Sequence, residues 1–223
     1  MKTNKRIACI TGATGLVGGH LLDMLIEDDS FEQVIVVNRR SQELQDESKV
    51  KEVIMDDFSN MNNHQTELKA TDYFCCLGTT INKAGSKENF KKVDYQYVVD
   101  FAAVAKEHDG DSFSLISAMG AKSSSMIFYN KVKGETEDAV KSLKINRTYI
   151  HRPSLITGER NEKRSGEATA KWLMTKLDFI FKGPLKKYGP VSAKQIAHAM
   201  KHFALNSSEN FKVIESDKIQ EVK

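Results

Sequence analysis

The sequence predicts an α/β protein with a doubly wound, mostly parallel sheet and a small C-terminal lobe. Apolar runs of strand length alternate along the chain with segments of helical periodicity, which is the pattern of successive βαβ units. The runs are rich in valine, isoleucine, cysteine and phenylalanine and lack polar alternation, as expected for parallel strands buried on both faces. We therefore expect six strands, at residues 6–10, 34–37, 50–55, 73–77, 113–117 and 148–150.

Helices are expected between and after these strands, at residues 16–27, 87–107, 125–141, 167–181 and 192–204. Ser192 can accept from the free amides of the last helix while Gln195, three residues on, reaches back, as in a capping box. Two polar stretches, 60–64 and 159–166, are expected to be loops. A chain of 223 residues suits one domain spanning the whole sequence, in which 153–190 would form most of the C-terminal lobe.

The composition is that of an ordinary globular protein, with 40% hydrophobic and 28% charged residues. Lysine and arginine number 33 against 30 aspartate and glutamate, and the two signs are interspersed, so nucleic-acid binding gains no support. The first apolar run is too short for a signal peptide core or a membrane span, which favours a cytoplasmic protein. Cys9, Cys75 and Cys76 lie in expected strands without ligand spacing, which favours reduced core thiols and predicts no metal site.

A glycine-rich segment follows the first expected strand and opens the first expected helix. Gly12 permits the tight turn, Gly15 lets the backbone approach a pyrophosphate, and Gly18 lets the helix pack against the sheet. The phosphates would lie at the positive end of the helix. The sequence thus predicts a Rossmann dinucleotide site with a loop of Gly12, Ala13, Thr14, Gly15, Leu16, Val17 and Gly18.

The second expected strand leads into Asn38, Arg39 and Arg40, where an acidic residue usually binds the adenosine ribose. Two guanidiniums would bind a ribose 2′-phosphate that a carboxylate would repel, so Arg39 and Arg40 favour NADP(H) over NAD(H). The alternative is that these arginines are solvated surface residues. Asp57, after the third strand, either accepts the adenine amino proton or initiates a turn.

A serine, a tyrosine and a lysine follow in the order that suits carbonyl reduction. Ser117 ends the fifth expected strand, Tyr129 comes twelve residues later, and Lys133 lies one helical turn beyond the tyrosine. The phenol can protonate the reacting oxygen with help from the lysine charge, and the serine hydroxyl can donate to that oxygen. The cofactor ribose would contact the lysine. It would also contact the backbone that closes the fourth strand, at Leu77, Gly78 and Thr79.

The middle of the chain reads FCCLGTT, KAGS, VDYQYV, SAMGAKSSS and YNKVKGE, and HRPSLITGER follows. These motifs resemble the short-chain dehydrogenase/reductase superfamily and, more narrowly, its atypical Tat-interacting oxidoreductase-like group. The resemblance implies a Rossmann fold that binds NADP(H), with cofactor or catalytic positions at Arg39, Arg40, Leu77, Gly78, Tyr129 and Lys133. Ile156 and Arg164 are assigned to the cofactor by the resemblance alone.

Three positions leave alternatives open. Ala118 stands where many superfamily members carry a catalytic second serine, so either Ser117 takes that role or the serine function is weakened. Asp94 stands near the place of an asparagine that belongs to the proton relay of many members. His151 either approaches the nicotinamide or is a structural histidine at the end of a strand.

Two functions are consistent with these residues. The first is an NADP(H)-dependent oxidoreductase that transfers hydride between the nicotinamide and a small carbonyl or alcohol, with Tyr129 as general acid or base, Lys133 as its charge partner and Ser117 as oxyanion donor. The second is an NADP(H)-binding sensor or interaction module with a protein partner and little or no turnover. The replaced serine and the short C-terminal substrate lobe leave room for the second.

Overall fold

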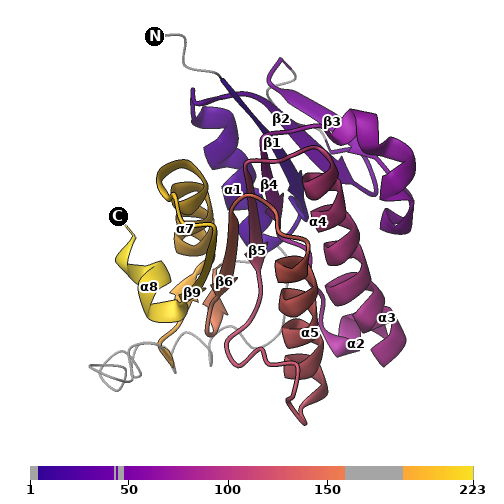
Figure 1. Ribbon diagram of the computed structural model, residues 1–223, viewed down its shortest axis with the longest axis vertical. Coiled ribbons are helices and arrows are strands. Elements are labelled where there is room, and N and C mark those ends of the chain that lie inside the picture. Colours follow the sequence, from indigo (N-terminus) through magenta and orange to yellow (C-terminus); the bar gives the residue numbers. More distant parts are fainter. Residues whose placement is uncertain (1–4, 43, 45–47, 159–187, 223) are drawn as a thin grey trace.

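The computed structural model of this protein describes residues 5–42, 44, 48–158 and 188–222. Within these residues, seven parallel strands form one sheet in the order β3-β2-β1-β4-β5-β6-β9 (Figure 1). The strands are β1 (Arg6–Thr11), β2 (Phe31–Asn38), β3 (Val50–Ile54), β4 (Asp72–Cys75), β5 (Ser112–Ile116), β6 (Thr148–Arg152) and β9 (Phe211–Glu215). The strand order reverses between β1 and β4, so the predicted doubly wound α/β fold is confirmed.

Helices cover both faces of this sheet (Figure 1). Among the described residues, α1 (Leu16–Glu27) and α7 (Ala193–Asn206) pack on one face, and η1 (Phe58–Leu68), α4 (Tyr97–Glu107) and α5 (Phe128–Ser142) pack on the other. Successive residues of β1 alternate between the two layers, with Ala8 and Ile10 under α1 and α7 and Cys9 under α4. All three are fully buried, which is why the strand reads as a continuous apolar run.

The six-strand prediction omits the edge strand β9 and a small second sheet. In β9 only Ile214 is fully enclosed, so this strand lacks the apolar run that marks the central strands. The second sheet pairs β7 (Ile156–Thr157) with β8 (Val191–Ser192), also in parallel. Strands of two residues carry no hydrophobic period, and periodicity could not have indicated them.

Three helical predictions need correction. Residues 60–64, predicted as a loop, lie in the 3-10 helix η1, whose first turn is capped by Asp57. The predicted helix 125–141 begins later, at Phe128, because the Ser125 hydroxyl accepts from the Ile127 amide and holds a turn there. The predicted helix 87–107 is divided by a π-helical turn and is preceded by a short helix, so this region contains α2 (Ile81–Ala84), α3 (Lys87–Lys91), η2 (Lys92–Gln96) and α4.

The predicted capping box at the start of α7 is half confirmed. Ser192 Oγ accepts from the Gln195 amide at 3.1 Å. The Gln195 side chain does not return to Ser192 but donates to the carbonyls of Ile219 and Val222, at the end of α8 (Ser216–Glu221). The predicted loop 159–166 and helix 167–181, and so most of the C-terminal lobe, lie outside the described residues.

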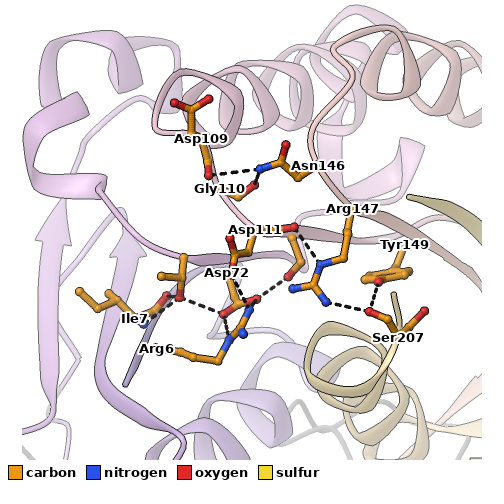
Figure 2. A network of polar contacts seen from close by, with 12 residues as sticks. Arg6, Ile7, Asp72, Asp109, Gly110, Asp111, Asn146, Arg147, Tyr149 and Ser207 are labelled. Atoms are coloured by element: carbon orange, nitrogen blue, oxygen red, sulfur yellow. Dashed lines mark hydrogen bonds and ion pairs between the residues drawn. The ribbon is translucent and has the colours of Figure 1, made fainter. Parts of the chain in front are cut away.

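The amino ends of the strands are joined by a network of polar contacts (Figure 2). Asp72, the first residue of β4, is fully buried and accepts from Arg6 Nε at 2.5 Å and Arg6 Nη2 at 2.6 Å. Ser112 Oγ donates to the same carboxylate at 2.5 Å. Arg147, just before β6, donates to the carbonyls of Asp111 and Ser207. One buried carboxylate and two guanidiniums therefore tie β1, β4, β5 and β6 together at this end.

Within the described residues, no helix combines the length and apolar character needed to cross a membrane. Nor does that part of the chain bring three or more His, Cys, Asp or Glu side chains into an arrangement that could hold a metal ion.

A cleft at the switch point and the helix that carries Tyr129

A cleft of about 860 Å³ opens at the carboxyl ends of the strands, beside the switch point between β1 and β4. Its volume is within the usual range of small-molecule and cofactor sites. Its walls come from the start of α1, the segment after β4, the end of β5, α5 and residues 153–156. The structure thus brings together twelve of the predicted site residues: Ala13, Thr14, Gly15, Leu16, Val17, Leu77, Gly78, Thr79, Ser117, Tyr129, Lys133 and Ile156.

The glycine loop has the close backbone packing that its sequence predicts. Gly12 has φ +76°, and a Cβ there would lie 2.6 Å from the Cys76 carbonyl carbon. A Cβ at Gly18 would lie 2.1 Å from the Gly12 carbonyl oxygen. Neither glycine lines the cleft, so both act by letting the loop fold tightly, whereas Gly15 forms part of the wall. No side chain caps α1 and its first turn has no acidic residue, which leaves backbone amides available to an anion.

Three side chains of α5 follow each other at spacings of four, on one face of the helix. Tyr129, in the first turn, is half-buried and its ring packs against Phe90, with centroids 5.6 Å apart. Lys133 is buried and its Nζ lies 2.8 Å from Asp94 Oδ1. Glu137 is buried one turn further on. The ion-pair partner of Lys133 is therefore Asp94, rather than the phenol alone.

The charge of Lys133 is stabilised against its burial. Desolvation works to lower the pKa of this ammonium, but the Asp94 carboxylate and the Tyr129 phenol outweigh it, so the pKa is raised above its ordinary value. Asp94 is fully buried in the π-helical turn η2, and its Oδ2 accepts from the Thr79 amide at 2.9 Å. Asp94 thus joins the segment after β4 to α5. π-Turns of this kind are frequent at functional sites.

Ser117 lies in the cleft wall, but its hydroxyl is already engaged. It is 6% exposed and donates to Glu137 Oε1. The Glu137 carboxylate also accepts two bonds from Arg152, at 3.0 Å from Nε and 2.5 Å from Nη2. The predicted role of Ser117 as donor to a substrate oxygen is therefore not available in this arrangement, because its single proton faces Glu137.

Arg39 and Arg40 are exposed just beyond the carboxyl end of β2 and do not line the cleft. The segment that carries them is held by Glu52 of β3. This carboxylate accepts from Asn38 Nδ2 at 3.0 Å, Ser41 Oγ at 2.7 Å and the Gln42 amide at 2.9 Å. Burial works to raise the pKa of Glu52, but these bonds outweigh it and lower the pKa. Sequence reasoning missed Glu52 because its partners belong to the neighbouring strand and loop.

Asp57 has the turn-initiating role that its sequence left open. Its Oδ1 accepts from the Ser59 amide and from the Tyr97 hydroxyl at 2.6 Å, and its Oδ2 lies 2.7 Å from Lys92 Nζ. The hydrogen bond from Lys92 is the largest cause, and the bonds from Ser59 and Tyr97 add to it, so the pKa of the carboxyl is held well below its usual range. Asp57 does not line the cleft, and its contact with adenine stays a prediction.

Of the remaining candidate residues, Ile156 lies in the cleft wall and His151 lies in the protein core. Ile156 lies in β7 and lines the cleft, while a Cβ at Gly158 would lie 3.2 Å from the Leu16 side chain, so this segment passes beside the first turn of α1. Arg164 lies outside the described residues. His151 is fully buried, faces the ring of Phe203 and does not line the cleft, which supports its structural interpretation.

A comparison with models of protein families finds a match over most of this chain. The model of a family described as NAD(P)H-binding matches residues 12–203. The chain belongs to this NAD(P)H-binding family. The matched range begins at Gly12 of the glycine loop and includes Tyr129 and Lys133. An NAD(P)H-binding protein with a Rossmann fold is therefore established from the sequence and the sheet together.

Curated relatives place this NAD(P)H-binding protein more narrowly. It is 35% identical over 201 residues to "Protein FMP52, mitochondrial" of Debaryomyces hansenii, covering 88% of this chain and 87% of that one. It is 35% identical over 178 residues to "Protein HTATIP2" of Rattus norvegicus, covering 78% of this chain and 71% of that one. These relatives confirm the resemblance to the atypical Tat-interacting group. Because several of them are named mitochondrial, they contradict the expectation of a cytoplasmic protein.

Solved structures confirm the fold of this NAD(P)H-binding protein. MoeE5 in complex with UDP-glucose and NAD superposes with a TM-score of 0.69 at 13% identity, over 93% of this chain and 74% of that one. A UDP-N-acetylglucosamine 4-epimerase from Methanobrevibacter ruminantium gives a TM-score of 0.71 at 15% identity, over 94% and 76% of the two chains. At such low identity the likeness concerns the fold alone.

Proposed function

We propose that this protein is an NADP(H)-dependent oxidoreductase that transfers hydride between the nicotinamide and a small carbonyl or alcohol. The observation that carries the proposal is that Tyr129 and Lys133 line the same cleft as the glycine loop. The candidate proton donor and the loop that would hold the dinucleotide therefore face the same cleft. When bound, the reduced nicotinamide supplies the hydride that the carbonyl carbon accepts. Tyr129 would deliver the proton that the resulting alkoxide requires.

The residues of the cleft fit such a cofactor. The amides from Ala13 to Val17 would hold the pyrophosphate at the start of α1. The backbone at Gly78 would lie beside the nicotinamide ribose, since a Cβ there would come within 3.6 Å of Asp94 and 3.9 Å of Lys133. Lys133 would hold the ribose hydroxyls, and its charge interacts with the Tyr129 phenol.

Arg39 and Arg40 support NADP(H) as the preferred cofactor. Among the arginines that the structure describes, Arg6, Arg147 and Arg152 all donate to carboxylates or carbonyls. Arg39 and Arg40 are exposed and make no such bond within that part of the chain. Two unengaged guanidiniums beside the end of β2 would bind the 2′-phosphate through charge-assisted hydrogen bonds.

A second candidate function is favoured by two contacts. The Lys133 charge is balanced by Asp94, which reduces the field that it exerts on Tyr129, and the Ser117 proton faces Glu137. A site built this way could bind NADP(H) without efficient proton transfer. The alternative is therefore an NADP(H)-binding sensor or interaction module with little turnover.

The two functions are separated by measuring NADPH binding and NADPH oxidation in the presence of a panel of small carbonyl compounds. An oxidoreductase consumes NADPH with at least one compound, and Tyr129→Phe lowers the rate by at least about 100-fold while leaving NADPH affinity intact. Tyr95→Phe is the matched control, because this tyrosine stacks with Lys91 and does not line the cleft. A sensor binds NADPH in all three proteins and oxidises it in none.

The cofactor preference is tested separately, by the ratio of NADH to NADPH dissociation constants. The double variant Arg39→Ala, Arg40→Ala should lose the preference for NADPH while binding NADH as before. Lys218→Ala, an exposed cation on α8, is the control. An unchanged ratio in the double variant would rule out the 2′-phosphate assignment.

A further inference from the structure

The direction of one hydrogen bond in the cleft wall is fixed by its surroundings. Ser117 Oγ and Glu137 Oε1 share one proton, and Arg152 faces both oxygens of Glu137 with N–H groups. A carboxylate in an ion pair has no hydrogen to donate. The proton therefore belongs to Ser117 and points away from the cleft, and the oxygen lone pairs of Ser117 are what remains for a ligand.

The partners of this hydrogen bond come from three elements and hold each other in place. Ser117 follows β5, Glu137 lies on α5 two turns after Tyr129, and Arg152 ends β6. Arg152 Nη1 also lies 3.1 Å from Glu215 of β9. Glu137 is 6% exposed, so turning the serine proton toward the cleft would leave a buried carboxylate oxygen with one donor fewer.

We infer that Ser117 acts on the cleft as a hydrogen-bond acceptor, with Glu137 and Arg152 as positioning residues, and that the substrate is an α-hydroxy carbonyl compound. This inference rests on the proposed oxidoreductase function. A carbonyl oxygen offers only lone pairs and would meet the lone pairs of Ser117, so it is directed to Tyr129, whose hydroxyl can donate. A hydroxyl group on the adjacent carbon can donate to Ser117 at the same time.

The chemistry of the reduction then balances within the cleft. The carbonyl carbon gains the hydride from NADPH and its oxygen gains the Tyr129 proton, which yields a vicinal diol and NADP⁺. The neighbouring hydroxyl keeps its own proton throughout and remains bonded to Ser117. A ketone without that hydroxyl would leave the largely buried Ser117 oxygen without a donor. Sites that hydrogen-bond a substrate hydroxyl discriminate against analogues that lack it.

The test compares 3-hydroxybutan-2-one with butan-2-one, which differ only in this hydroxyl. The protein with NADPH should reduce the hydroxy ketone with at least about tenfold higher kcat/KM. Ser117→Ala should bring the ratio toward one. Ser114→Ala is the matched control, since this buried serine lies three residues earlier in β5, does not line the cleft and should leave the ratio unchanged. Equal rates in the wild type, or an unchanged ratio in Ser117→Ala, would overturn the inference.

Binding of the same two probes to the NADP⁺ complex, followed by saturation-transfer NMR, separates this inference from the proposed function. If the hydroxy ketone binds in preference to butan-2-one, loses that preference in Ser117→Ala, and no compound is reduced, the oxidoreductase proposal fails while the acceptor role of Ser117 stands. If both ketones are instead reduced at equal rates and Tyr129→Phe loses this activity, the oxidoreductase proposal stands. The acceptor role of Ser117 then fails. Glu137→Ala provides a further readout, because releasing the Ser117 proton should shift the ratio toward butan-2-one, which a purely structural role would not do.

Discussion

The two ends of the sheet use buried charge in different ways. At the amino end, Asp72 is enclosed and each of its oxygens receives donors from Arg6, Thr71 or Ser112 (Figure 2). At the carboxyl end, Asp94–Lys133 and Glu137–Arg152 are also paired. The first pair lines a cleft of about 860 Å³, and the second is connected to that cleft through Ser117, which lines it. The donors of the amino-end network are all used within the protein, whereas one of the two carboxyl-end pairs faces space for a ligand.

This difference shows how one fold separates stability from binding. In parallel βαβ units, the carboxyl ends of the strands open into loops and helix starts, where amides remain without partners. The amino ends receive the chain from the preceding helices, and their polar side chains can saturate one another. Substitutions at the amino end should therefore change the free energy of unfolding alone, while those at the carboxyl end should change ligand binding as well.

The largest expected effect is the loss of the Asp72 carboxylate at the amino end. Asp72→Ala leaves the Arg6 guanidinium without its main partner in a largely enclosed site and should lower the free energy of unfolding by about 3–5 kcal/mol. Chemical denaturation at pH 7 measures this change. The NADPH affinity of the protein that remains folded should be unaffected. A large loss of affinity at full stability would show that the two ends are not independent.

Next in size is Gly12→Ala at the carboxyl end. The new Cβ would meet the Cys76 carbonyl in a backbone with positive φ, at a cost of about 3 kcal/mol, and would displace the loop that receives the pyrophosphate. Gly85→Ala is the matched control, because Gly85 has φ +78° but open space around it, so only about 1 kcal/mol is expected. NADPH titration and thermal unfolding should show that Gly12→Ala alone loses cofactor binding.

A third prediction concerns His151, a buried polar group near the carboxyl end that has no hydrogen-bond partner among the described residues. Burial lowers its pKa from 6.5 to about 3. Between these values the unfolded chain binds the extra proton, so stability falls as the pH drops below about 6.5. From pH 6.5 to 4.5 the loss of stability due to this group is about 2 kcal/mol. His151→Leu should remove that part of the decline, as measured by denaturation at both pH values, and an identical decline in both proteins would contradict the assignment.

The smallest effect is expected at Glu52, which holds the segment of Arg39 and Arg40. Glu52→Gln weakens the bonds to Asn38, Ser41 and Gln42 and should reduce the preference for NADPH over NADH by about threefold, or about 0.7 kcal/mol. Glu32→Gln, an exposed residue on β2, is the control. Competition between the two cofactors measures the ratio, and a preference equal to that of the wild type would show that the arginines need no such support.

Local patterns were sufficient for much of this molecule. The apolar runs of β1, β2, β4, β5 and β6 predict a sheet buried on both faces, because a strand enclosed by two helix layers has no polar side. The spacing of Gly12, Gly15 and Gly18 predicts the tight turn at α1. Predictions failed where the signal was not local: β9 has one fully buried residue, and η1 depends on the capping carboxylate of Asp57.

The sequence by itself determined the doubly wound fold, because strand and helix patterns alternate along the whole chain. It also determined the glycine loop and the placing of Tyr129 and Lys133 on one face of a helix, because each of these follows from the spacing of residues within a single segment. Only the tertiary structure decided what those residues contact. The pairing of Lys133 with Asp94, the bond from Ser117 to Glu137 and the support of Arg39 and Arg40 by Glu52 join segments that are between 10 and 39 residues apart. Spacing along the chain carries no information about such contacts, because they depend on which helices and strands lie side by side in the fold.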